Sequence, residues 1–237
     1  MHAPFPTRLE AGRLLAQGKN PGPAIKTENG RIPVVCVGLS LGGLTPLKTI
    51  FRQLSLDTGM AFIVISHVSR TGPTKLPWLL SMWSKMPVYL ARNGMVVKPN
   101  HIYVIPPGQE ITVGDGHFAA RPRSKMRGWS NVITLFLDSL VKARKPAGVA
   151  VILSGMDADG AGALREFNNR GGLTIVQDLE SAECKAMPHS AIDTGFVDYV
   201  LPPQSIAAKV EEIAKSFQKP PANEPPAADP ADRRHAG

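Results

Sequence analysis

Three side chains suited to acyl transfer follow separate apolar runs of this 237-residue sequence. Ser40 lies in "VVCVGLSLGGL", His67 in "AFIVISHVSR" and Asp159 in "VAVILSGMDADG". A serine becomes a nucleophile when a histidine takes its proton and an aspartate orients the ring and stabilises its charged form. These residues therefore form a candidate Ser–His–Asp set, provided that the fold brings them together.

The glycines around Ser40 permit three interpretations, namely a phosphate cradle, a packing turn or an exposed nucleophile. The run from Gly38 to Gly42 matches G-x-S-x-G, but the Lys-Ser/Thr of a P-loop and the G-x-G-x-x-G spacing are both missing. Taken singly, His67 is also compatible with a structural role, and Asp159 could cap a helix. Only the joint placement of the three side chains favours catalysis.

The elements that must position these residues alternate between apolar strands and amphipathic helices. We expect strands at 34–38, 61–66, 88–91, 101–106, 148–154, 173–178 and 198–201, and helices at 45–54, 76–85, 131–143, 160–170 and 203–217. Alternation around Gly114-Asp115-Gly116 predicts a hairpin at 110–120. The fold class is α/β: a doubly wound, mostly parallel sheet with helices on both faces and a small β-hairpin. Ligands of such sheets lie beyond the carboxyl ends of the strands, where the three side chains occur.

Composition divides the chain into three parts. Residues 1–30 are predicted to be a leader or linker, 31–218 the catalytic domain, and 219–237 a disordered tail rich in Pro and Ala. About 30 residues before the first strand are too few for a further folded domain there, so a stand-alone domain is expected.

Charge and composition restrict the partners and the compartment. The net charge of +8 favours acidic partners, but aromatic residues make up only 6% of the chain, so no nucleic-acid partner is expected. No run of 18 apolar residues and no signal-type leader occur, which predicts a cytoplasmic protein without membrane insertion. Cys36 and Cys184 have no C-x-x-C spacing and the histidines no H-x₃-H spacing, so neither a metal nor a cofactor is predicted.

Six stretches, in order along the chain, resemble the catalytic domain of the bacterial chemotaxis protein-glutamate methylesterases. They are "VGLSLGGL" (37–44), "VISHV" (64–68), "HIYVIPPG" (101–108), "WSNVITLFLDSL" (129–140), "VILSGMDADGAGAL" (151–164) and "VQDLESAECKAMPHSAIDTGFVDYVLPP" (176–203). Together these motifs are far more specific than any one of them.

The resemblance implies a hydrolase that releases methanol from glutamate methyl esters and that can also deamidate glutamines. The implied partner is the methylated cytoplasmic domain of a chemoreceptor, an acidic helical bundle. By motif, Ser40 matches the nucleophile, His67 the base and Asp159 the acidic member. The backbone at Met156 and Leu41 matches the oxyanion site.

The sequence departs from the family pattern at two positions near the candidate site. Leu41 stands where threonine or alanine is common and could narrow the entrance. Asp157 stands where the family loop G-M-G-x-D-G has glycine. If Asp157 faces the oxyanion site it opposes the developing charge, and if it faces solvent it has no effect. Many family members also carry a receiver domain, for which the 30 leading residues leave no room.

The segment "RPRSKMRG" carries a basic residue at every second position, namely Arg121, Arg123, Lys125 and Arg127. It is either a solvated loop or a surface that steers the protein toward an acidic receptor.

Three other functions remain as alternatives: a general serine esterase, a nucleotide-binding module, and a receptor-binding adaptor of the same fold that has lost turnover. If His67 is the base, its ordinary pKa of about 6.5 predicts that activity falls below neutral pH.

Overall fold

The computed structural model describes four stretches of the chain, 32–67, 74–123, 131–143 and 148–218. The expected leader and tail lie outside the described residues, so the domain limits drawn from composition stay predictions. None of the helices in these four stretches is both long and apolar enough to cross a membrane.

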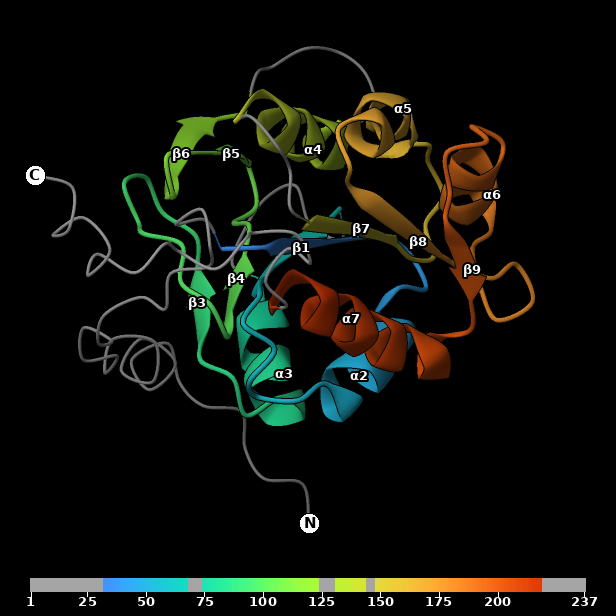
Figure 1. The fold of residues 1–237 in the computed structure, drawn as a ribbon, viewed down its shortest axis with the longest axis horizontal. Helices are drawn as coiled ribbons and strands as arrows, with labels where there is room; N and C mark the ends of the chain where they lie inside the picture. Colours follow the sequence, from blue (N-terminus) through green and yellow to red (C-terminus); the bar gives the residue numbers. More distant parts are fainter. Residues whose placement is uncertain (1–31, 68–73, 124–130, 144–147, 219–237) are drawn as a thin grey trace, which may run out of the picture.

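A seven-stranded sheet occupies the centre of the molecule in the order β3-β4-β2-β1-β7-β8-β9 (Figure 1). Its strands are β1 (Val34–Leu39), β2 (Ala61–Ser66), β3 (Val88–Leu90), β4 (His101–Val104), β7 (Gly148–Ile152), β8 (Leu173–Gln177) and β9 (Tyr199–Leu201). All six pairings are parallel, where the sequence predicted a mostly parallel sheet. The strand order reverses between β1 and β7, and at such a switch point the connections leave in opposite directions and open a crevice.

Helices cover both faces of the sheet, as the near-continuous apolar strands predicted (Figure 1). One face carries α2 (Leu44–Gln53), α3 (Leu76–Trp83) and α7 (Pro203–Gln218), and the other carries α4 (Val132–Lys142), α5 (Ala161–Asn169) and α6 (Ala186–Ile192). Every residue of β1 is buried, and its side chains alternate between the two cores. Cys36 packs in the core under α4, and Val35 and Val37 pack in the core under α2.

The predicted hairpin consists of β5 (Gln109–Gly114) and β6 (His117–Pro122). Asp115 and Gly116 form its two-residue turn with φ angles of 47° and 77°, the left-handed pair that a twisted hairpin favours. The backbone N–H of Val113 donates to Ser139 Oγ of α4 at 3.1 Å. The hairpin is thereby attached to the helix that also reaches the candidate site.

Candidate active site

The candidate residues meet at the carboxyl edge of the sheet, beside the switch point. Leu39 of β1 pairs with Ser66 of β2, so the next residues, Ser40 and His67, leave adjacent strands side by side. Neighbouring strands lie about 4.8 Å apart, which places a serine and a histidine here within reach of each other. On the other side of β1, the Ser40 N–H donates to the Ser154 carbonyl at 2.9 Å, which brings in the loop after β7.

The glycines that flank Ser40 allow close approaches of other elements. A Cβ atom at Gly38 would lie 2.6 Å from Ile133 Cδ1 of α4, and one at Gly42 would lie 2.5 Å from Ser154 Oγ. Gly42 also has a φ of 78°, which side chains rarely adopt. These glycines therefore meet packing requirements, and the same close packing places α4 and the loop after β7 around Ser40.

His67 lies between two carboxylates. Its Nδ1 is 2.6 Å from Asp157 Oδ2, and its Nε2 is 2.8 Å from Asp159 Oδ2. The side chains of His67, Asp157 and Asp159 are 7%, 8% and 1% exposed. The structure thus places the His67 ring against the Asp159 carboxylate. It places Asp157 in neither expected orientation, because this carboxylate faces the imidazole rather than the oxyanion site or solvent.

Asp159 is held by the first turn of α4. Its carboxylate accepts the N–H groups of Ile133 at 2.8 Å and Thr134 at 2.9 Å, and the Thr134 hydroxyl at 2.8 Å. A carboxylate is favoured at a helix N-terminus, where backbone N–H groups lack partners within the helix. Gly160 turns the chain out of this position with a φ of 96° and donates its N–H to Thr134 Oγ1. Sequence reasoning missed Thr134, although it lies in the quoted "WSNVITLF" motif.

The two carboxylates control the charge of His67. Burial alone lowers the pKa of His67, but hydrogen bonds to Asp157 and Asp159 and their negative charges outweigh burial and raise the pKa to about 9. Burial would raise the pKa of Asp157, yet its bonds to His67 and to the Asp159 N–H lower it. The cluster therefore favours a charged imidazole and a charged Asp157 at neutral pH.

Several polar groups around Ser40 are available to a ligand. Within the described stretches, the Ser40 hydroxyl makes no hydrogen bond, and the backbone N–H groups of Leu41 and Met156 donate to no protein acceptor. Leu41 and Met156 are 53% and 59% exposed. Two backbone donors close to a serine can stabilise an oxyanion if they converge on it.

A buried serine that sequence reasoning missed connects the loops of the site. Ser154 is fully buried, and its hydroxyl donates to the Leu41 carbonyl at 2.8 Å and accepts the Cys184 N–H at 2.9 Å. Gln177 of β8 accepts the Ser154 N–H at 2.9 Å. These bonds join the segment after Ser40 to the segment before α6. The one sequence feature that pointed to Ser154 was its position directly after an apolar strand.

The basic segment is described only in part. Arg121 Nε donates to Glu110 Oε2 at 2.7 Å across the hairpin, with the arginine side chain 68% exposed. Arg123 follows β6, and its backbone N–H donates to the Gly108 carbonyl. Lys125 and Arg127 lie outside the described residues.

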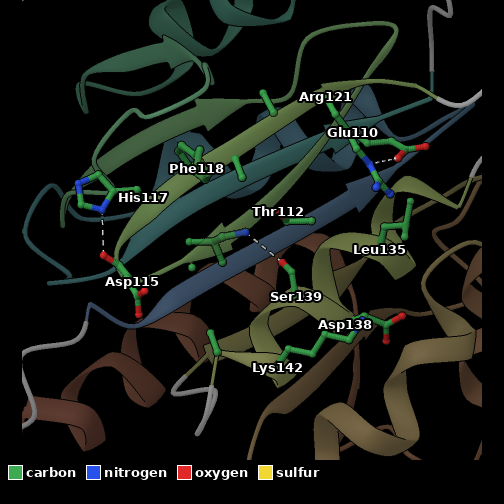
Figure 2. Close-up of a pocket in the computed structure, with 15 residues that line it drawn as sticks. Glu110, Thr112, Asp115, His117, Phe118, Arg121, Leu135, Asp138, Ser139 and Lys142 are labelled. Atoms are coloured by element: carbon green, nitrogen blue, oxygen red, sulfur yellow. Dashed lines mark hydrogen bonds and ion pairs between the residues drawn. The ribbon is translucent and has the colours of Figure 1, made fainter.

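A cavity of about 810 Å³ lies between the hairpin and α4 (Figure 2). Arg121 and Glu110 line one end, and Asp138 and Lys142 of α4 line another part of it. None of its lining residues belongs to the cluster around His67, so this cavity is separate from the candidate reaction site. In the described part of the chain, no three His, Cys, Asp or Glu side chains are grouped so as to hold a metal ion.

Comparison with known proteins gives consistent results. Residues 35–210 match the family model described as CheB methylesterase. The chain is 31% identical over 193 residues to the protein-glutamate methylesterase/protein-glutamine glutaminase of group 3 operon of Rhizobium meliloti, covering 80% of this chain and 54% of that protein. It is 29% identical over 219 residues to protein-glutamate methylesterase/protein-glutamine glutaminase 3 of Pseudomonas aeruginosa. This match covers 89% of this chain and 65% of that protein. The crystal structure of the Thermotoga maritima CheB methylesterase catalytic domain superposes with a TM-score of 0.71 at 28% identity, covering 77% of this chain and 99% of that one. The chain thus spans about half the length of the Rhizobium relative.

Proposed function

Because the chain belongs to the CheB methylesterase family, we propose that it is a serine hydrolase of glutamate methyl esters on chemoreceptor cytoplasmic domains. The observation that carries this proposal is the convergence of Ser40, His67 and Asp159 at one edge of the sheet. The relatives named as methylesterases and glutaminases support the same reaction class.

In the acylation step, neutral His67 takes the Ser40 proton as Oγ attacks the ester carbonyl. The new C–O bond places a negative charge on the carbonyl oxygen, and the N–H groups of Leu41 and Met156 are the candidate donors to it. One such donor contributes about 3–4 kcal/mol to transition-state stabilisation. Asp159 stabilises the imidazolium that forms. The imidazolium then protonates the leaving methoxide, the ester C–O bond breaks, and methanol departs.

In the second step, water attacks the glutamyl ester of Ser40. His67 takes a proton from this water and returns it to Ser40 Oγ as the acyl C–O bond breaks, which releases the glutamate carboxyl group and restores the enzyme. A glutamine side chain follows the same route with ammonia in place of methanol. The chemistry therefore also accommodates deamidation.

The proposed partner is an acidic helical receptor surface. The net charge of +8 favours this encounter, and the exposed guanidinium of Arg121 on β6 is a described part of the basic segment. Steering of this kind raises the association rate and is lost as salt screens the charges.

Methanol release from a methylated receptor, compared between the native chain and Ser40→Ala, tests the reaction. We expect the variant to lose at least about a thousandfold in rate, because no other group replaces the nucleophile. Equal rates for the two proteins would refute the serine mechanism.

A second candidate is the adaptor without turnover, because both ring nitrogens of His67 contact carboxylates rather than Ser40. An adaptor would bind the methylated receptor but release no more methanol than Ser40→Ala does. A binding measurement made beside the methanol assay therefore separates the two functions.

A further inference from the structure

The His67 ring is engaged in a way that opposes its role as a base. Its Nδ1 and Nε2 lie 2.6 Å and 2.8 Å from oxygens of Asp157 and Asp159. A neutral imidazole has one N–H donor and one lone pair, so it can donate to only one of two ionised carboxylates. The geometry therefore fits the doubly protonated ring, which has no lone pair to accept the Ser40 proton.

The two carboxylates are held to different degrees. Asp159 accepts three further hydrogen bonds from Ile133 and Thr134 at the start of α4, and its side chain is 1% exposed. Asp157 has one further bond, from the Asp159 N–H at 3.1 Å, and lies in the loop between β7 and α5. Moving Asp159 would break four hydrogen bonds, whereas moving Asp157 breaks two. The nitrogen that can be freed is therefore Nδ1.

Ser40 is the neighbour that needs this nitrogen. It leaves β1 beside His67, and the His67 N–H still donates to the Leu39 carbonyl at 3.2 Å, so the pairing of the two strands continues to the site. Within the described stretches the Ser40 hydroxyl has no hydrogen-bond partner. As long as Asp159 keeps Nε2, Nδ1 is the ring nitrogen left for the nucleophile, and Asp157 holds it.

We propose that Asp157 is a positioning residue that restrains the reaction. Its carboxylate occupies Nδ1 of His67, and Ser40 becomes a nucleophile only in molecules in which Asp157 has left that nitrogen. The two arrangements are states of one equilibrium, and a substrate that binds better when Asp157 is displaced shifts the population toward the active one. This inference rests on the hydrolase function proposed above.

The electrostatics of the cluster agree with this role. Among the described residues, the charged groups that face the imidazole are Asp157 and Asp159, and they raise its pKa to about 9 against the effect of burial. The nearby thiol of Cys36 stays neutral, because burial first and the charge of Asp159 second raise its pKa. Removing the Asp157 charge therefore lowers the pKa of His67 and increases the neutral fraction at pH 7.

The test compares the native chain with Asp157→Ala, Asp157→Asn and Ser40→Ala. Asparagine keeps an acceptor for the Asp159 N–H, so it controls for a change in loop shape. The matched control is Asp193→Asn, which removes the carboxylate of the exposed His189–Asp193 pair at 2.8 Å. Hydrolysis of p-nitrophenyl acetate is followed as a function of pH, and the His67 ring is titrated by NMR.

We expect both Asp157 variants to hydrolyse the ester at least about tenfold faster than the native chain at about pH 7, because each unit of pKa lowering raises the neutral fraction about tenfold. The rise of the rate with pH should begin at lower pH, and the NMR titration of His67 should shift in the same direction. Asp193→Asn should match the native chain in both measurements.

A slower Asp157→Asn enzyme would overturn the proposal, because Asp157 would then be the carboxylate that catalysis needs. The proposal would also be overturned if the Asp157 variants hydrolysed the ester at the native rate. If the native chain were still faster than Ser40→Ala in that case, the hydrolase function would remain supported. If no protein exceeds Ser40→Ala on this ester and none exceeds it in methanol release from the methylated receptor, the hydrolase function itself is refuted and the restraint fails with it.

Discussion

Replacing Asp159 by asparagine tests how strongly this carboxylate is built into the fold. Asp159 accepts hydrogen bonds from His67, Ile133 and Thr134, with the last residue donating both its N–H and its hydroxyl. Asparagine offers one acceptor oxygen and one NH₂ group. Whichever way the amide is turned, its NH₂ group faces hydrogen-bond donors in a site where the side chain is 1% exposed.

The size of the effect follows from these contacts. Two donors lose their acceptor, and a buried unsatisfied donor costs about 1–3 kcal/mol. The start of α4 also loses a negative charge worth about 0.3–1 kcal/mol. Removing one member of a buried charged pair costs about 3–5 kcal/mol in other proteins, so we expect a loss in this range.

Urea unfolding at about pH 7 measures the change. Asp138→Asn is the matched control, because this aspartate lies on the same helix, is partly exposed and makes no side-chain hydrogen bond within the described stretches. The control should stay within about 0.5 kcal/mol of the native free energy of unfolding. A loss below about 1 kcal/mol for Asp159→Asn would refute the idea that the first turn of α4 depends on this carboxylate.

Three further changes test other parts of the site. The pKa of His67, about 9 in the folded state, predicts stabilisation that is complete below about pH 6.5 and lost as pH rises through 9. The difference in unfolding free energy between the native chain and Asp157→Asn should therefore shrink over that interval, and a constant difference would contradict the pairing. Ser154→Ala should cost about 1–3 kcal/mol in chemical denaturation, because buried loop groups lose their partner, and a neutral result would count against the connection. Gly155→Ala should lower the melting temperature and the esterase rate, because the added Cβ would lie 1.9 Å from Met187 Sδ of α6; full retention of both would show that this helix adapts freely.

Strand ends were the most predictable part of the site. Apolar runs of five or six residues flanked by glycine place Ser40, His67 and the loop after β7 at one edge of any parallel sheet that contains them, and the observed register agrees. The α6 helix was less predictable. It spans Ala186–Ile192, a range in which the sequence analysis expected no helix. A seven-residue helix has too few turns for a clear periodicity.

The contacts of Asp159 were not predictable, because they depend on how α4 approaches β1. The start of α4 reaches this carboxylate since Gly38 lacks a side chain and Ile133 packs against its Cα. Neither residue carries reactive chemistry, so a search for reactive side chains does not find them. Such long-range packing decides which of several plausible roles an aspartate takes.

The protonation state of His67 was also not predictable from the sequence, because it depends on the orientation of neighbouring side chains. The ordinary pKa of histidine predicted activity down to neutral pH, whereas two carboxylates within 3 Å raise the pKa to about 9. Sequence reasoning identified Asp157 as a departure but could not decide which way it points, because a rotation about one side-chain bond separates solvent from the imidazole. An added negative charge two residues from Asp159 thus changes which proton state is favoured without changing the fold.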